Sequence, residues 1–328
     1  MKFPSQARIT YESGSLSNDA WSAAGIISLP KDLSLLNRRG YASTTRKGVP
    51  LVYRCKFTLY AQTLAGEGYA TVTDFADGDS DGFEPTRNLF TTVKILGAQN
   101  NWAMRNAAVV MHDAREKMLK RAGVKKSDRG AYAHEIRYNY DVPDQTWLSC
   151  KDGDGDDFVG GTWDSTTLMV ESDTDVQLKL VGPASDENSA INDDAQQLGY
   201  TYLASRATVL EDTNLHATTT PGRFSFVKQL RDGDMDGHGD NILDNARGEQ
   251  DNPPYDLFTV ADVNNDITEP VELGRLIANQ GLPYAECEIH VPFGIFEVQA
   301  QHFDAGDTNI TSPIAYSLDV LDIYEMQG

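Results

Sequence analysis

The chain has 328 residues, of which 40% are hydrophobic and 23% are charged, and its formal net charge at pH 7 is −21. This apolar content excludes an intrinsically disordered chain, and the acidic balance argues against a protein whose whole surface grips nucleic acid. The length allows one large hydrophobic core or two of ordinary size. The acidic surface favours cation binding, and it is equally typical of a protein from a salty environment.

Targeting signals and cysteines narrow the class of protein further. No apolar run follows Lys2, so we expect no secretory signal peptide, and no stretch approaches the roughly 18 apolar residues of a membrane span. Cys55, Cys150 and Cys287 are far apart and form no C-x-x-C pair. This spacing excludes a disulfide framework and a cysteine zinc site, and it favours synthesis in a reducing cytoplasm.

Alternating apolar and polar residues predict four strands in the first hundred residues, at 6–12, 49–64, 69–75 and 89–96. The clearest is 49–64, where Tyr53, Cys55, Phe57 and Leu59 alternate with polar residues. The pair Leu29-Pro30 is expected to interrupt regular structure after the first strand.

The segment 100–122 is predicted to be a long helix, because apolar residues recur there at spacings of three and four. Asn100 or Asn101 can cap its start, and Gly123 stands where a left-handed residue commonly ends a helix. A single helix in a β-rich chain must lie against a sheet or fill a corner between strands. The apolar positions are Met104, Ala107, Ala108, Met111, Met118, Leu119 and Ala122.

The remainder of the chain again reads as short strands with one helix. The segment 182–194 has almost no apolar residues and is interpreted as a linker. A second helix is predicted at 269–279, where Val271, Leu273, Leu276 and Ile277 are the apolar positions. The predicted strands are 132–142, 146–150, 166–170, 176–181, 201–210, 223–230, 255–260, 285–301 and 314–326.

The two halves of the chain share this order of strands, a helix and further strands. A faint local likeness follows each helix, since the segments from Gly130 and from Gly281 both hold a Tyr-Ala pair and a Glu-Ile strand. Together these features favour two copies of one β module, divided into 1–181, a linker at 182–194, and 195–328. Short strands without alternating βα units favour sandwiches or jelly rolls over a parallel sheet.

The loop 232–244 is the strongest candidate for a metal site. Several carboxylates surround Gly237, which permits a sharp turn, and Ca²⁺ prefers six to eight oxygen ligands from such a loop. It is not an EF-hand, because Leu243 occupies the twelfth position. The alternative is a solvated acidic turn. The candidate ligands are Asp232, Asp234, Asp236, Asp240 and Asp244, with weaker candidates in Asp77, Asp79, Asp81, Asp152, Asp154 and Asp156.

A basic cluster stands out near the end of the first helix in this acidic chain. It is a candidate surface for contact with a genome or a membrane, and the alternative is ordinary charge at a helix C-terminus followed by a solvated loop. The chain has no basic N-terminal tail for packaging a genome, so any nucleic-acid contact is expected to be weak or indirect. The cluster comprises Arg115, Lys117, Lys120, Arg121, Lys125, Lys126 and Arg129.

Catalytic motifs are missing from the sequence, which contains no G-x-S-x-G, no phosphate-binding Gly-rich loop and no H-E-x-x-H, so we expect no enzyme. The six histidines are scattered, and they are expected at the surface or at interfaces. Trp102, Trp147 and Trp163 are expected in the core or at subunit contacts rather than in a sugar platform.

Two β modules, each with a late helix, and no signal peptide, disulfide or catalytic motif resemble the double jelly-roll major capsid proteins of tailless icosahedral viruses. The nearest types are the corticovirus, finnlakevirus and tectivirus proteins, and the resemblance is architectural, over roughly 6–326. It implies two tandem eight-stranded jelly rolls, each with a helix inserted late in the strand order. It also implies a homotrimer with a pseudo-sixfold outline, and trimer–trimer contacts that tile a virion shell.

The same resemblance implies further partners and cofactors. Penton or minor capsid proteins and an internal membrane would contact the shell, and Ca²⁺ between or within subunits would fit the 232–244 loop. The protein would be made in the host cytoplasm. Two other classes remain open, namely a calcium-dependent carbohydrate-binding or adhesin β-sandwich and a polysaccharide-active β-sandwich enzyme. The adhesin normally needs export. The enzyme needs a polar cleft with catalytic groups, for example two carboxylates from among the 49 acidic residues.

Overall fold

The computed structural model of the chain describes a set of segments separated by gaps. They are 3–13, 21–60, 90–129, 136–140, 147–158, 160, 163–169, 175–179, 195–199, 202, 270–279, 284–303 and 314–327.

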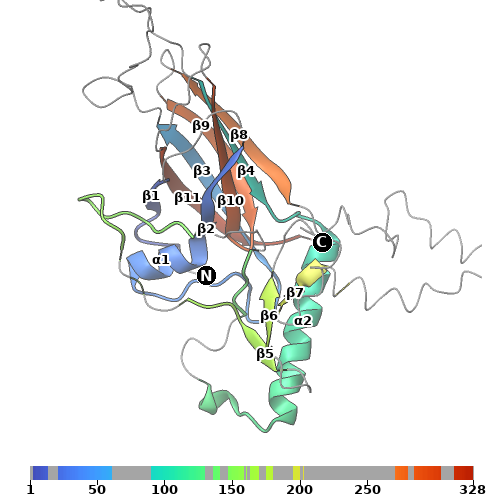
Figure 1. Ribbon diagram of the computed structural model, residues 1–328. Helices are drawn as coiled ribbons and strands as arrows, with labels where there is room; N and C mark the ends of the chain where they lie inside the picture. The colour runs from blue at the N-terminus through green and yellow to red at the C-terminus, as the bar shows by residue number, and fades with distance from the viewer. Residues whose placement is uncertain are drawn as a thin grey trace, which may run out of the picture.

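Eight strands form two antiparallel four-stranded sheets that pack face to face as a sandwich (Figure 1). The first sheet has the order β1 (Arg8–Glu12), β11 (Ala315–Glu325), β3 (Leu51–Tyr60) and β9 (Tyr284–Pro292). The second sheet has the order β2 (Ser22–Ser28), β10 (Ile295–Phe303), β4 (Phe90–Gly97) and β8 (Val271–Asn279). The prediction of a mainly β protein is therefore confirmed.

The order of these strands is that of a single eight-stranded jelly roll. Successive strands lie in opposite sheets, except that β4 and β8 are neighbours in one sheet. Each of the six ladders of the sandwich joins a strand before residue 98 to a strand after residue 270. The predicted division into two consecutive jelly rolls, 1–181 and 195–328, is therefore wrong for these strands, because the ladders pair residues far apart in the sequence. The predicted linker at 182–194 lies outside the described residues.

The predicted helix at 269–279 is wrong, since these residues form the edge strand β8. Leu276 and Ala278 are buried, whereas Ile277 between them is 57% exposed, which is the alternation of a strand. Gly274 lies on the same face of the strand as Leu276 and Ala278, and a Cβ atom there would lie 2.9 Å from Cγ2 of Ile289. Two of these three inward positions, Gly274 and Ala278, are small, whereas the apolar Ile277 faces outward, so the apolar pattern of the sequence hides the period of two.

The space between the sheets is filled by apolar and aromatic side chains. The predicted alternation of β3 is confirmed, because Tyr53, Cys55, Phe57 and Leu59 are fully buried. Phe57 stacks on Tyr316 of β11, with ring centroids 5.1 Å apart. One core is thus built from both ends of the chain.

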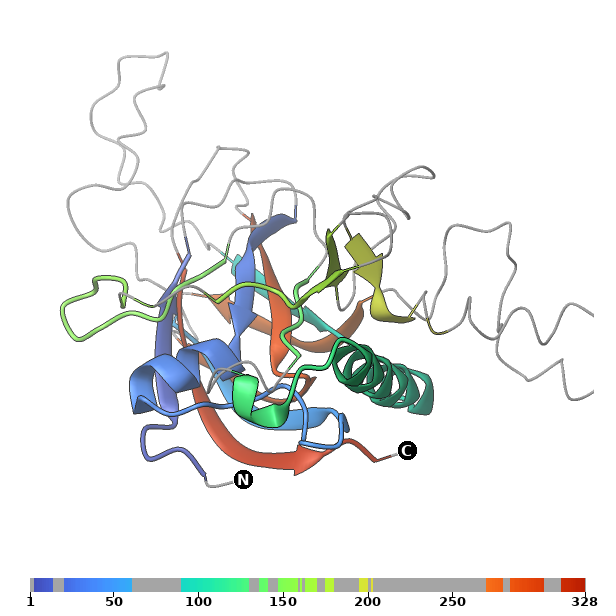
Figure 2. The same cartoon turned by 90° about the horizontal axis from the view of Figure 1, so that it is seen from below.

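Between β2 and β3, the helix α1 (Leu29–Asn37) covers one end of the sandwich (Figures 1 and 2). Pro30 stands in its first turn, where proline's fixed φ suits a helix and its missing N–H costs nothing. The Leu29-Pro30 pair therefore begins a helix, where the sequence predicted an interruption.

The long connection from β4 to β8 carries the second helix, α2 (Trp102–Arg121), which begins at one end of the sandwich and runs away from the strands (Figures 1 and 2). The helix prediction is confirmed. The Asn101 side chain accepts a hydrogen bond from the Met104 N–H at 2.9 Å, and Gly123 has a φ of +77°. Its buried residues lie in the first three turns, and Val110 is 50% exposed. The short helix η1 (Lys126–Asp128) follows.

A small third sheet completes the described architecture and lies beside α2 in Figure 1. Its strands are β5 (Thr167–Met169), β6 (Asp175–Lys179) and β7 (Ala195–Gln197), and β6 pairs with β7 in parallel. Within the described residues, no helix has both the length and the apolar character needed to cross a membrane.

The turn between β9 and β10 places two residues, Phe293 and Gly294, at positive φ values of 60° and 71°. Two such residues are typical of a tight hairpin turn of type I′. A Cβ atom on Gly294 would lie 2.8 Å from Pro30 and from the Tyr53 ring. We expect Gly294→Ala to lower the free energy of unfolding by about 1–3 kcal/mol, through backbone strain and steric overlap. Denaturant unfolding measures this change.

Gly40→Ala is the matched control for this prediction. No heavy atom lies within 4 Å of a Cβ built at Gly40, and its φ is not in the left-handed region. We expect this variant to unfold within about 0.5 kcal/mol of the wild type. Equal stability of the two variants would contradict the account of the turn.

Candidate ligand pocket and the predicted sites

A pocket of about 420 Å³ lies where three irregular segments meet α1. Its first wall is formed by 136–140 and 163–167, which are joined by two hydrogen bonds. The Thr166 N–H donates to the Arg137 carbonyl at 2.9 Å, and the Arg137 N–H donates to Oγ1 of Thr166 at 2.7 Å. Tyr138 anchors this wall on the protein core, because its ring packs edge-on against Phe293 with centroids 5.0 Å apart.

The second wall is formed by Trp147 and by α1. The segment beginning at Trp147 runs beside β2, and the Leu148 N–H donates to the Ile26 carbonyl at 2.9 Å. The next turn of chain reaches β1, where the Lys151 N–H donates to the Thr10 carbonyl at 2.9 Å. These backbone bonds fix the pocket to the jelly roll.

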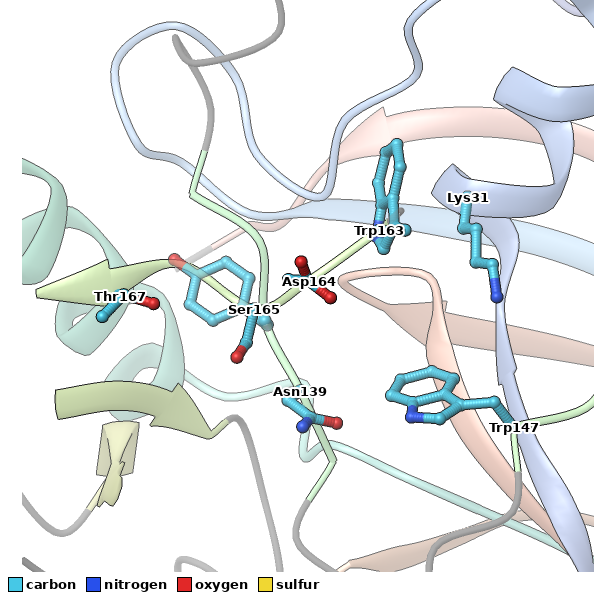
Figure 3. Close-up of a pocket in the computed structure, with 8 residues that line it drawn as sticks. Lys31, Asn139, Trp147, Trp163, Asp164, Ser165 and Thr167 are labelled. Atoms are coloured by element: carbon cyan, nitrogen blue, oxygen red, sulfur yellow. The ribbon is translucent and has the colours of Figure 1, made fainter. Parts of the chain in front are cut away.

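Two indoles and several polar groups border the same cavity (Figure 3). The Lys31 ammonium lies 6.0 Å from the ring centroid of Trp147, and the Arg137 guanidinium lies 4.4 Å from that of Trp163. The other lining residues are Tyr138, Asn139, Asp164, Ser165 and Thr167. Lys31 and Asp164 are the two charged residues among the eight, so the formal charge of the lining is zero.

The pocket was not predicted from the sequence. Trp147 and Trp163 were expected in the core or at subunit contacts, yet both are half-buried side chains that line the cavity. Trp102, the third, is 37% exposed at the start of α2. Three irregular segments carry most of the lining. They contain no periodic pattern from which the proximity of Trp147 and Trp163 could have been predicted.

The predicted calcium ligands are only partly within the described residues. Asp232, Asp234, Asp236, Asp240 and Asp244 lie outside them, as do Asp77, Asp79 and Asp81. In the remaining loop, Asp152 accepts backbone hydrogen bonds from Asp154 and Asp156, each at 2.9 Å. This is the turn geometry that aspartate commonly supplies. In the part of the chain that is described, no three His, Cys, Asp or Glu side chains gather to hold a metal.

The predicted basic cluster lies on the second half of α2 and in the η1 region. Arg129 is neutralised by Glu116, with which it forms hydrogen bonds of 2.6 and 3.0 Å, and this pair lowers the pKa of Glu116. Arg115 is half-buried, and burial lowers its pKa. Five basic residues remain exposed, namely Lys117, Lys120, Arg121, Lys125 and Lys126.

Of the histidines, His112 is buried on α2, contrary to the expectation of a surface or interface position. It packs against Gly48, where a Cβ atom would lie 2.4 Å from that of His112. His290 is exposed on β9, and its Nδ1 lies 2.8 Å from the Tyr324 hydroxyl.

A buried carboxyl group follows the pocket residue Lys31 in the first turn of α1. Asp32 is 1% exposed, and the Tyr11 hydroxyl donates to its Oδ2 at 2.6 Å. Burial raises the pKa of Asp32 to about 7, although the Tyr11 hydrogen bond and the Lys31 charge oppose this rise. Burial also raises the pKa of the neighbouring Cys150 to about 12.

The arrangement can do two things chemically. Among the described residues, the jelly roll offers a packed body in which β8 and β9 are edge strands available for association, and the pocket offers two aromatic surfaces beside hydrogen-bonding groups. Comparison with protein-family models, with curated proteins and with solved structures finds no match for this chain.

Proposed function

We propose that this chain is a structural capsid protein that assembles with copies of itself into an icosahedral virus shell. The observation that supports this proposal most directly is the strand order, because two four-stranded sheets in jelly-roll order are the architecture of many viral capsid subunits. Lectin domains and cupins share the architecture, so the order alone does not separate the three classes.

The interior of the sandwich favours the structural role. A cupin or a ligand-carrying barrel uses the space between its sheets, whereas this space is occupied by stacked rings. Tyr11 and Phe57 both stack on Tyr316, with centroids 5.6 and 5.1 Å away. A rigid packed body of this kind is suited to forming a wall.

The flank formed by β8 and β9 supports self-association. Both are edge strands of their sheets, and edge strands present unpaired backbone groups to a partner. This flank also exposes large apolar side chains, with Val271 at 36%, Ile277 at 57% and Tyr284 at 55%. Exposed apolar groups beside free edges are typical of a protein–protein contact.

The expected unit is a homotrimer, which then forms trimer–trimer contacts and meets minor capsid proteins in the virion. The five exposed basic residues of α2 and the η1 region are the surface that we assign to an internal membrane or, indirectly, to the genome. Calcium between subunits would be held by the acidic loops. The double jelly roll of the resembling families is not needed for this proposal, which rests on one jelly roll.

Size-exclusion chromatography with light scattering and negative-stain electron microscopy test the proposal. A monomer has a mass of 36.1 kDa, so we expect a trimer of about three times that mass or closed particles. Addition of EDTA tests whether calcium strengthens the assembly. A monomer at every concentration, with and without Ca²⁺, would contradict the proposal.

A charge placed on the β8–β9 flank should separate assembly from folding. We expect Ile277→Lys to shift the protein toward monomers, because it would bury an unpaired ammonium in the contact. Val110→Lys is the matched control, since Val110 is also exposed, at 50%, but lies on α2. Loss of assembly in both variants, or in neither, would count against this flank as the contact.

A further inference from the structure

We propose that the pocket between α1, Trp147 and the segments 136–140 and 163–167 binds a neutral sugar ring. The inference is independent of the proposed capsid function, because it concerns the lining of one cavity in one subunit. It also requires no calcium.

The size and rigidity of the pocket suit a small ligand. Its volume of about 420 Å³ lies within the range of roughly 300–1,000 Å³ that is common for small-molecule sites. Its walls are held by backbone hydrogen bonds to β2 and by the burial of Tyr138 against Phe293. A site that is already formed loses little free energy to ordering when a ligand enters.

The chemistry of the lining selects among ligand classes. A phosphate or another strong anion would need several Arg or Lys groups, whereas Lys31 is balanced here by Asp164. A divalent cation would need several oxygen ligands carrying negative charge, and Asp164 is the one carboxylate of the lining. An organic cation would favour the indoles, but Lys31 and Arg137 already lie beside them and would repel it.

A neutral sugar fits what remains. A pyranose ring presents a face of C–H groups, which packs against an indole, and a rim of hydroxyls that donate and accept hydrogen bonds. Trp147 and Trp163 supply the aromatic faces. The amide of Asn139, the carboxylate of Asp164 and the Lys31 ammonium border the same cavity and can serve the hydroxyls (Figure 3).

Arg137 also contributes from outside the cavity. Its guanidinium lies 4.4 Å from the ring centroid of Trp163, so it stacks on that indole. Both its backbone N–H and its backbone carbonyl are hydrogen-bonded to Thr166. We therefore expect the Trp163 ring to be held in place before a ligand arrives.

The test uses the full chain and a panel of named sugars. The neutral members are glucose, galactose, mannose, N-acetylglucosamine, lactose, cellobiose and maltose, and the acidic members are glucuronic and N-acetylneuraminic acid. Saturation-transfer NMR detects weak binding, and isothermal titration calorimetry measures the affinity. We expect at least one neutral sugar to bind, with transfer to the ring C–H protons that face an indole.

Variants then locate the site. We expect Trp147→Ala and Trp163→Ala to weaken binding by about tenfold or more, which corresponds to the loss of one well-packed aromatic contact. Trp102→Ala is the matched control, because Trp102 is exposed on α2 and does not line the pocket. Asp164→Asn gives a second variant in case an alanine variant fails to fold, since Asp164 is exposed and its replacement should weaken binding several-fold.

Three results would overturn the inference. The first is that no neutral sugar binds the wild-type protein at millimolar concentration. The second is that acidic sugars alone bind. The third is that binding persists unchanged in the folded Trp147, Trp163 and Asp164 variants, or is lost equally in the Trp102 control. The assembly state tests the capsid proposal separately, so failure of the sugar-binding proposal can be distinguished from failure of the capsid proposal.

Discussion

Replacement of Asp32 by asparagine is expected to remove a large pH dependence from the stability of this protein. The carboxyl group is buried in the first turn of α1, and burial raises its pKa from an ordinary value of 3.8 to about 7. Between these values the folded protein keeps the proton, whereas the unfolded chain has released it. The free energy of unfolding of the wild type therefore falls as the pH rises from about 4 to about 7, and it levels off above.

The magnitude follows from the width of that window. Each pH unit changes the free energy of unfolding by about 1.4 kcal/mol while one proton separates the two states, so the total loss is roughly 4 kcal/mol. The asparagine side chain carries no ionisable group, and its amide oxygen can still accept the hydrogen bond of Tyr11. We expect Asp32→Asn to flatten this part of the profile and to make the protein more stable than the wild type at pH 8.

Denaturant unfolding at pH 4, 5, 6, 7 and 8 measures both profiles. Asp113→Asn is the matched control, because the Asp113 side chain is 62% exposed on α2, and the variant should retain the wild-type slope. Burial also raises the pKa of Glu297, which contributes a slope of the same sign, whereas arginine partners lower the pKa of Glu116, Glu272 and Glu288, which contributes a slope of the opposite sign. The test is therefore the difference between the wild-type and Asp32→Asn profiles. Parallel profiles for the wild type and Asp32→Asn would refute the assignment.

Tyr11 gives an independent check of the same site. Its hydroxyl stabilises the ionised carboxylate, so it limits the rise in the pKa of Asp32. Tyr11→Phe removes this donor, and the fall in stability should then continue to higher pH than in the wild type. Together the Asp32 and Tyr11 variants test whether the buried carboxyl group couples the stability of the fold to pH.

Local patterns in the sequence were enough for the elements whose signals are local. The alternation of β3 places Tyr53, Cys55, Phe57 and Leu59 on one face, and one face of any packed sheet must be apolar. The helix α2 carries its own cap at Asn101 and its own left-handed glycine at Gly123. Each of these features is decided within a few residues, so sequence reasoning could find it.

Features decided by distant residues could not be found in this way. The inward face of β8 is Gly274, Leu276 and Ala278, and Gly274 leaves no room for a side chain because Ile289 of β9 approaches closely there. The pocket depends on Trp147 and Trp163 arriving beside α1 from irregular segments. The pairing of strands has the same character, because the repeated order of elements suggested two modules where the ladders make one.

The largest expected effect concerns that pairing, because neither half of the chain should fold alone. A fragment ending at residue 181 contains β1, β2, β3 and β4, yet β11 lies between β1 and β3, and β10 lies between β2 and β4. The fragment 195–328 has the complementary problem, since β3 separates β9 from β11 and β4 separates β8 from β10. Each half therefore lacks every ladder of the sandwich.

We expect each fragment alone to show no cooperative unfolding transition by circular dichroism, because strands without partners cannot satisfy their backbone hydrogen bonds or bury their apolar faces. Co-expression of the two fragments is the matched control. They should co-purify and unfold cooperatively, since together they supply all eight strands. A cooperatively folded 1–181 fragment would instead mean that the first half is a jelly roll by itself, and the six ladders between the two ends of the chain would then be wrong.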